Sequence, residues 1–300
     1  KEKSRFIEEI ICQKERALKK IKAVQIPRAS FSVKVTPKRI EIEKNSSVIN
    51  FLRTLEYSAS SINTYLHCPL KFYYQYVLGL REKEELLDEP EGADIGTFIH
   101  ELLENTFSVF LNKRPVIDAR FKDMFFKALD KKFENEFKKK LKSDAFLVKE
   151  ILDVRLKRFL ENESRRHVSQ ILSLEKNFKG RLKLASGEFA VKAIIDRIDL
   201  LEDESLLVID YKTGSSDITP SSNVEKIQAA GRSREAVKDT VKSFQLPIYL
   251  YLVSGDAEFI GRQTNAALYL IKEAAIEGLK DGMMDVYMQN WPYISLCRAS

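Results

Sequence analysis

The stretch AIIDRIDLLEDESLLVIDYKTG, residues 193–214, decides the fold. Two apolar runs flank a short polar run, a pattern that predicts two antiparallel β-strands joined by a tight turn. Asp210 and Lys212 lie two residues apart on the second strand, so their side chains point to the same face. Asp196 interrupts the apolar run of the first strand. Either aspartate alone would more often be a solvated charge, but buried carboxylates need a cation or a tight set of hydrogen bonds.

The register of this hairpin decides whether the two aspartates meet. Residues directly opposite each other share a face, so Asp196 lies opposite Asp210 only if the loop has an odd number of residues, for instance 202–204. A two-residue loop would turn them apart unless a bulge intervened. Two converging carboxylates would form a site for a hard divalent ion such as Mg²⁺.

Lys212 adds a possible catalytic group to these carboxylates. Its ammonium could orient an attacking water and stabilise the charge that develops on a phosphate during hydrolysis. The alternative is that Lys212 and Asp210 form a surface ion pair of little energetic value.

Outward from this hairpin, the second half of the chain is typical of an α/β core. Period-two patterns predict strands at about 175–185, 188–201, 206–212 and 265–271, with a helix that runs to about residue 254 before the last strand. The strands begin as an antiparallel meander. The sequence therefore predicts a central mixed sheet flanked by helices.

The first half of the chain is predominantly helical. Apolar residues at helical spacing predict helices at about 1–24, 58–65, 70–78, 95–110, 118–142 and 144–171. Residues 28–44 alternate and predict two short strands. A large all-helical N-terminal part thus precedes the α/β core.

Composition sets broad limits on the class of protein. Of 300 residues 44% are apolar and the net charge is only +6, which excludes intrinsic disorder and gives a weak tilt toward polyanionic partners. Three widely spaced cysteines without a CxxC pair favour a reducing compartment and argue against a zinc ribbon. No apolar run reaches the length of a membrane span, so we expect a cytoplasmic protein without a membrane partner. The start at Lys1 rather than Met favours a segment of a longer polypeptide.

Five motifs in order resemble RecB-type nucleases of the PD-(D/E)XK superfamily. Residues 193–199 and 208–214 resemble the "GxxDRxD … DYKTG" signature, although Ala193 stands where the family often has Gly. Residues 96–104 resemble the "GxxxHxxLE" helix, and residues 243–249 resemble the "QLPxY" helix. Residues 57–72 resemble a motif found ahead of the nuclease core in AddB-type helicase–nuclease subunits.

The resemblance implies a restriction-endonuclease-like core and a role for each motif residue. His100, Asp196, Asp210 and the main-chain carbonyl of Tyr211 would hold Mg²⁺ or Mn²⁺, and the catalytic residues would be Asp196, Asp210 and Lys212. Five further residues would support the site or bind DNA: Glu104, Glu175, Asp199, Gln245 and Tyr249. Glu104 lies one helical turn from His100 and could orient it, while Asp199 would support the site indirectly or pair with a neighbouring cation. The alternative for Tyr249 is core packing and for Gln245 a cap.

Cys68 occupies a position at which many AddB-like nucleases carry a ligand to an iron–sulfur cluster. Only Cys297 follows it, whereas the family places three more ligands late in the chain, so we expect no cluster. Cys68 is then predicted to be a small buried residue. The nearby aromatics, Tyr65, Phe72, Tyr73, Tyr74 and Tyr76, could stack on unpaired bases, but core packing is the stronger expectation for most.

The resulting prediction is a metal-dependent nuclease that cuts single-stranded DNA beside a partner helicase, in double-strand-break processing and recombination repair. Residues 1–56 would be the tail of a helicase-like domain, 57–172 the helical part with His100, 173–275 the nuclease core and 276–300 unassigned. Two alternatives stay open: an inactive DNA-binding scaffold that keeps the fold, and a stand-alone nuclease of the CRISPR-adaptation type.

Overall fold

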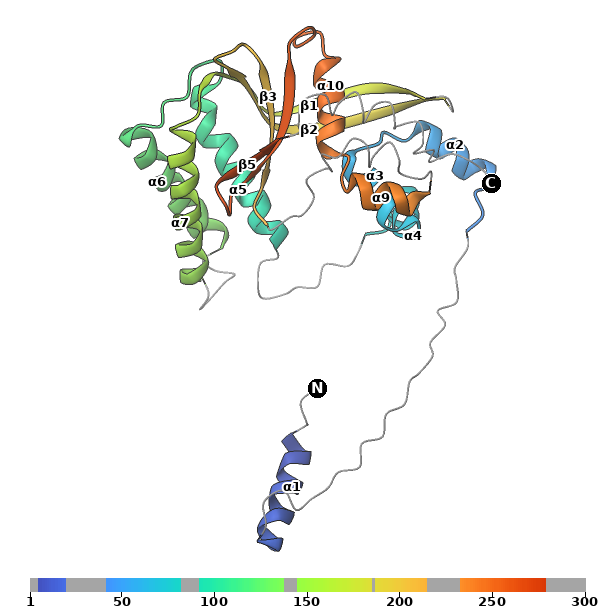
Figure 1. Cartoon of the computed structure of the whole chain (residues 1–300), viewed down its shortest axis with the longest axis vertical. Coiled ribbons are helices and arrows are strands. Elements are labelled where there is room, and N and C mark those ends of the chain that lie inside the picture. The colour runs from blue at the N-terminus through green and yellow to red at the C-terminus, as the bar shows by residue number, and fades with distance from the viewer. Residues whose placement is uncertain are drawn as a thin grey trace. The chain divides into compact units, whose positions relative to one another are not determined.

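The computed structural model describes residues 5–19, 42–81, 92–137, 145–184, 187–214 and 233–278 (Figure 1). It divides into two compact units, Lys1–Glu43 and Lys44–Ser300. The first unit contains helix α1 (Arg5–Leu18), which confirms the predicted N-terminal helix but ends earlier than residue 24. Nearly all of the segment predicted as two strands, residues 28–44, lies outside the described residues.

A five-stranded mixed sheet forms the centre of the second unit. Its strands lie in the order β1 (Val168–Leu184), β2 (Gly187–Leu201), β3 (Leu206–Lys212), β4 (Thr264–Leu270) and β5 (Ala275–Gly278). All neighbours are antiparallel except β3 and β4, which are parallel. A parallel pair needs a long crossover, and here the crossover carries helices α9 (Arg234–Val241) and α10 (Gln245–Ser254). The predicted sheet, begun by an antiparallel meander, is confirmed.

Helices cover both faces of this sheet (Figure 1). One apolar cluster joins a sheet face to α5 (Gly92–Phe107), α6 (Ala119–Glu136) and α7 (Ala145–Glu163). The other joins the opposite face to α2 (Ser46–Thr54), α3 (Ala59–His67), α4 (Pro69–Phe72), α9 and α10. A π-helical turn, η1 (Tyr73–Val77), continues α4, and a 3-10 turn, η2 (Ser108–Phe110), continues α5. None of the helices in the described part of the chain has the length and apolarity needed to cross a bilayer.

The β2–β3 hairpin has the odd-numbered loop that the aspartates require. Leu200 pairs with Leu206, and the Leu201 main-chain N–H donates to the Ser205 carbonyl at 2.9 Å. Residues 202–204 form the loop, and Glu204 turns the chain with a φ of 64°. The register therefore brings Asp196 and Asp210 to opposing positions, as one of the two sequence alternatives predicts.

The predicted helix over residues 144–171 is wrong in its last part. Helix α7 ends at Glu163 and strand β1 begins at Val168, seven residues before the predicted start of the strand. The Ile171 main chain exchanges hydrogen bonds with residues 112–113, so pairing with a distant segment overrides the local helical spacing.

Two other elements depart from the sequence prediction. The single helix expected to run to residue 254 is two helices, because the chain turns at Lys242, whose φ is 62°. Strand β5, residues 275–278, has no counterpart in the prediction and lies at the edge of the sheet.

Candidate active site

Three neighbouring strands each contribute one carboxylate at the same level of the sheet. The β1–β2 register on both sides of Glu175 places it opposite Asp196, and the β2–β3 register reaches the pair just before Asp196 and Asp210. Glu175 has a φ of 44°, a left-handed conformation that is uncommon for a residue other than glycine. The three acids form a row across β1, β2 and β3.

His100 on α5 reaches this row from the helical layer. Its Nδ1 atom lies 3.4 Å from Asp196 Oδ2 and 3.6 Å from Glu175 Oε1. Its Nε2 atom donates to the main-chain carbonyl of Tyr211 at 3.0 Å. Burial opposes protonation of the ring, but hydrogen bonding to Asp196 and Glu175 outweighs it and raises the pKa of His100 to about 10.

The β3 main chain ties the carboxylates to the imidazole. The Tyr211 N–H donates to Asp196 Oδ2 at 2.6 Å, while the carbonyl of the same residue accepts from His100. Gly96, one turn before His100, faces Thr213, whose Oγ1 would lie 3.5 Å from an added Cβ. Helix α5 therefore sits directly against the end of β3.

Asp210 is held on the other face of the sheet by helix α10. Its Oδ1 atom accepts from Gln245 Nε2 at 2.6 Å and from the Tyr249 hydroxyl at 3.1 Å. Its Oδ2 atom lies 2.6 Å from Lys212 Nζ. Burial and the nearby charge of Asp196 raise the pKa of Asp210 to about 6, although Lys212 opposes the shift.

The break between α9 and α10 puts Gln245 at this place. Asn63 on α3 donates to Ser243 Oγ at 3.1 Å, and its Oδ1 atom accepts from the Phe244 N–H at 3.1 Å. This side chain fixes the turn that starts α10 with Gln245. The sequence prediction of one continuous helix misses Asn63, because nothing local marks its partner 180 residues away.

A second group of buried charges lies behind the site and is here called the arginine cluster: Glu163, Arg166, Arg197 and Asp199. Arg197 donates to Asp199 at 2.6 Å and to Glu163 at 2.7 Å, and its guanidinium carbon lies 5.1 Å from the Phe107 ring centre. Arg166 NH2 lies 2.8 Å from Asp199 Oδ2. The sequence alternative that Asp199 pairs with a neighbouring cation is therefore confirmed, whereas the part of Glu163 has no signal in the sequence.

The arginine cluster also touches Tyr211, whose main chain organises the site. Arg197 NH1 lies 3.3 Å from the Tyr211 hydroxyl, and that ring packs against Phe159 and Tyr269 at centroid distances of 5.9 Å. The Tyr211 side chain is thus anchored in the core on one side, while its N–H and carbonyl serve the carboxylates.

Most of the predicted site residues lie together, with one exception. The carboxylate site, as it is called below, comprises His100, Glu175, Asp196, Asp210 and Lys212, with Gln245 and Tyr249 holding Asp210. Glu104 is exposed, whereas the ring nitrogens of His100 face Tyr211, Glu175 and Asp196.

Cys68 requires a correction. The sequence predicts a buried side chain, but Cys68 is exposed, because it caps α4 and its sulfur accepts from the Lys71 N–H at 3.4 Å. Cys297 lies outside the described residues. Core packing is confirmed for Phe72, which is buried, whereas Tyr74 is 37% exposed.

The donor set of the carboxylate site fits a divalent cation. Ligand atoms of His100, Glu175 and Asp196 all lie within 4.8 Å of one another. The 3.0 Å between His100 Nε2 and the Tyr211 oxygen matches the roughly 3 Å that separates adjacent ligands of an octahedral ion bound at 2.0–2.1 Å. With His100 neutral, as a ligand must be, three carboxylates face one lysine, so one divalent ion would neutralise the excess.

Comparisons with known proteins agree with this geometry. Residues 56–288 match the family model of the PD-(D/E)XK nuclease superfamily. The chain is 30% identical over 169 residues to a protein of Streptococcus agalactiae named as a subunit of an ATP-dependent helicase/deoxyribonuclease, covering 54% of this chain and 14% of that protein. It is 27% identical over 211 residues to the protein of the same name from Acetivibrio thermocellus, covering 63% and 18%.

An uncharacterized protein of Rickettsia felis is 28% identical over 170 residues, covering 53% of this chain and 18% of the relative. The chain thus spans less than a fifth of the length of each of these three relatives. The family model, by contrast, covers most of the chain and includes every residue of the carboxylate site. This chain belongs to the PD-(D/E)XK nuclease superfamily.

Proposed function

We propose that this chain is a metal-dependent nuclease that cuts single-stranded DNA, as part of a helicase–nuclease complex in double-strand-break processing and recombination repair. The observation that carries the proposal is the convergence of His100, Glu175 and Asp196 within 4.8 Å, next to the Asp210–Lys212 pair. The helicase context rests on the names of the helicase/deoxyribonuclease proteins that the chain resembles.

His100, Asp196, Asp210 and the Tyr211 carbonyl would hold the cation, as the family motif implies, and Glu175 lies close enough to His100 and Asp196 to share in the site. Imidazole and carboxylate donors suit Mn²⁺ as well as Mg²⁺. When bound there, a divalent cation lowers the pKa of a bound water and offsets negative charge on the scissile phosphate.

The chain's own residues then have separate tasks. Lys212, which is only 23% exposed, holds its ammonium beside Asp210, where it can orient the attacking water and stabilise the developing phosphorane charge. Gln245 and Tyr249 keep Asp210 aimed at the site through its Oδ1 atom. Tyr211 fixes Asp196 through its N–H.

Cleavage of an end-labelled single-stranded oligonucleotide tests the proposal. We expect cutting in Mg²⁺ or Mn²⁺, none in EDTA, and a loss of at least roughly 1,000-fold in Asp210→Asn. Asparagine keeps the shape of the side chain and can still accept from Gln245, so the fold should survive. Asp123→Asn, at an exposed position on α6, is the matched control and should cut normally. Cutting by Asp210→Asn at the rate of the unmodified chain would refute the assignment, and cation-independent binding without any cutting would favour the scaffold alternative.

A further inference from the structure

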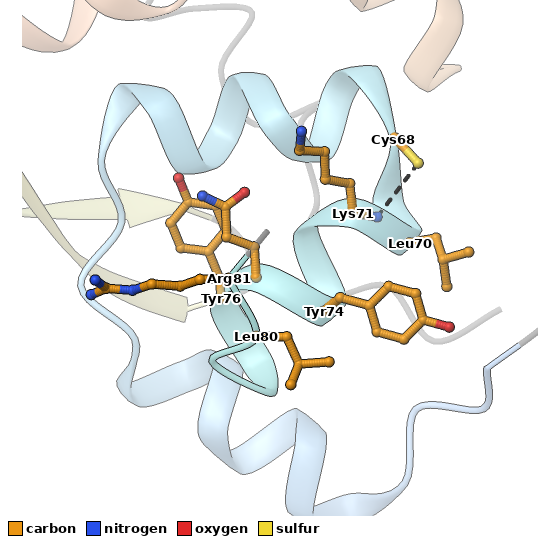
Figure 2. A pocket seen from close by; sticks show the side chains of 8 residues that line it. Cys68, Leu70, Lys71, Tyr74, Tyr76, Leu80 and Arg81 are labelled. Carbon is orange, nitrogen blue, oxygen red and sulfur yellow. Dashed lines mark hydrogen bonds between the residues drawn. The ribbon is translucent and has the colours of Figure 1, made fainter. Parts of the chain in front are cut away.

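An open pocket of about 930 Å³ lies against α4 and η1, on the helical layer that carries α3 and α9 (Figure 2). Its lining includes Leu70, Lys71, Tyr74, Tyr76, Leu80 and Arg81. None of these residues belongs to the carboxylate site. The pocket is therefore a second feature of the same unit that the metal chemistry leaves unexplained.

The chain forms this pocket by folding back after a π-helical turn. The Leu78 N–H donates to the Tyr73 carbonyl at 3.0 Å, and the Leu80 N–H donates to the Tyr74 carbonyl at 2.9 Å. Gly79 turns the chain with a φ of 67°, a conformation that glycine adopts without strain. Leu80 and Arg81 thereby return to the side of Tyr74. π-Helical turns of this kind are frequent at functional sites.

One wall of the pocket is rigid and the other is open. Phe72 is buried and stacks on Tyr76 with a centroid distance of 5.3 Å and an interplanar angle of 28°, so the core fixes Tyr76. Tyr74, by contrast, is 37% exposed, and Leu80 is 56% exposed. An aromatic ring thus stands beside a preformed hollow with part of its surface in solvent.

The charge of the lining has one sign. Lys71 and Arg81 are the charged residues among those that line the pocket, and both are cations. A polyanion would complement them, and phosphates bind lysine and arginine through charge-assisted hydrogen bonds. Exposed aromatic rings beside cations are the combination that single-strand binding surfaces use, with bases on the rings and phosphates on the cations.

The pocket is also mechanically connected to the site. The Arg234 guanidinium, at the start of α9, donates to the carbonyls of Leu66 and His67, where α3 ends just before the pocket. Asn63 on the same helix α3 fixes the turn in front of Gln245. One short helix therefore links the pocket to the residues that hold Asp210.

We propose that this pocket is a subsite for an unpaired DNA strand, with a base stacked on Tyr74 and neighbouring phosphates on Lys71 and Arg81. The inference rests on the proposed function and extends it, because it names the surface that recognises the strand outside the metal site. A duplex does not fit this chemistry, since its bases are already stacked on one another. An acidic peptide would use the two cations but would gain nothing specific from the ring.

Fluorescence anisotropy of a labelled oligothymidylate of about 20 nucleotides, with the full chain in EDTA, tests the proposal without any cleavage. Tyr74→Ala should weaken binding roughly five- to 100-fold, and Tyr74→Phe should restore it because the ring remains. Lys71→Gln and Arg81→Gln should each weaken binding and lower the salt slope by about 0.7. Matched controls are Phe146→Ala, an aromatic residue 75% exposed on α7, and Lys127→Gln, exposed on α6; both should bind normally.

Circular dichroism and the unfolding midpoint of each variant show whether it is folded. Affinity and salt slope in Tyr74→Ala and in Lys71→Gln/Arg81→Gln that equal those of the unmodified chain would overturn the subsite. Equal competition by polyglutamate, combined with no effect of Tyr74→Ala, would instead indicate an acidic protein partner and also overturn it. Loss of cleavage in every condition with Tyr74-dependent binding intact would refute the proposed nuclease and leave the subsite standing.

Discussion

The carboxylate site and the arginine cluster lie side by side on β2, and both bury charge, but they balance it differently. In the arginine cluster two carboxylates, Glu163 and Asp199, meet two guanidinium groups at hydrogen-bonding distance. In the carboxylate site three acids share one lysine and one histidine whose pKa is raised to about 10. A balanced set of buried charges serves the fold, whereas an anionic surplus calls for a cation from outside.

The difference matters because the two clusters share a chain segment. Asp196 belongs to the carboxylate site and Arg197, the next residue, belongs to the arginine cluster. Tyr211 repeats the arrangement on β3, with its hydroxyl near Arg197 and its main chain bonded to Asp196 and His100. The arginine cluster thus provides a rigid support on which the less balanced site is built.

The largest expected effect is on stability, from Arg197→Met. The side chain is fully buried, and its removal leaves Glu163 and Asp199 without their shared partner, at a cost of about 3–5 kcal/mol in the free energy of unfolding. Urea denaturation followed by circular dichroism measures it. Arg181→Met removes an ion pair from an arginine that is 74% exposed and should leave the unfolding midpoint unchanged. Equal midpoints for the two variants would break the comparison.

The next effect is on catalysis, from Lys212→Ala. We expect cleavage to fall by roughly 100- to 1,000-fold, because the cationic group near the reacting phosphate is lost. Affinity for Mn²⁺, measured by isothermal titration calorimetry, should persist, since the lysine competes with rather than assists the cation. Loss of Mn²⁺ binding in this variant, with the unfolding midpoint intact, would show that Lys212 organises the carboxylates instead.

A moderate effect is expected from acid, and it comes from the arginine cluster. Burial alone would raise the pKa of Glu163, but Arg197 and Arg166 outweigh burial and lower it below its ordinary value of 4.5. The stability that Glu163 contributes is therefore complete above pH 4.5 and is lost as the pH falls through the lower pKa of the folded state. Urea midpoints measured from neutral pH down into the acid range should fall less steeply in Glu163→Gln. An unchanged slope in that variant would contradict the assignment.

The smallest effect is expected from Glu104→Ala. The side chain is exposed, so the cleavage rate should change by less than about twofold. Glu175→Ala is the informative partner, because Glu175 lies 3.6 Å from His100 and its removal should lower affinity for Mn²⁺ by roughly 10- to 100-fold. A larger loss from Glu104→Ala than from Glu175→Ala would return the role of orienting His100 to the helix neighbour.

Local sequence is enough for much of the hairpin and little else of the site. The strand positions, the odd loop at residues 202–204 and the shared face of Asp210 and Lys212 follow from alternation and turn chemistry, which act over a few residues. The end of α7 does not follow, because strand pairing with residues 112–113 outweighs the helical spacing there. The same holds for the exposure of Cys68, which depends on how α4 packs.

By itself the sequence determined the mixed α/β class, the meander and the identity of the acids, since these are written in periodicity and motif spacing within single segments. Only the tertiary structure decided that Glu175 joins His100 and that Glu104 does not, that Asn63 sets the start of α10, and that Glu163 pairs with Arg197. Such partners lie far apart along the chain. Their meeting depends on the packing of whole helices on the sheet, which no local pattern encodes.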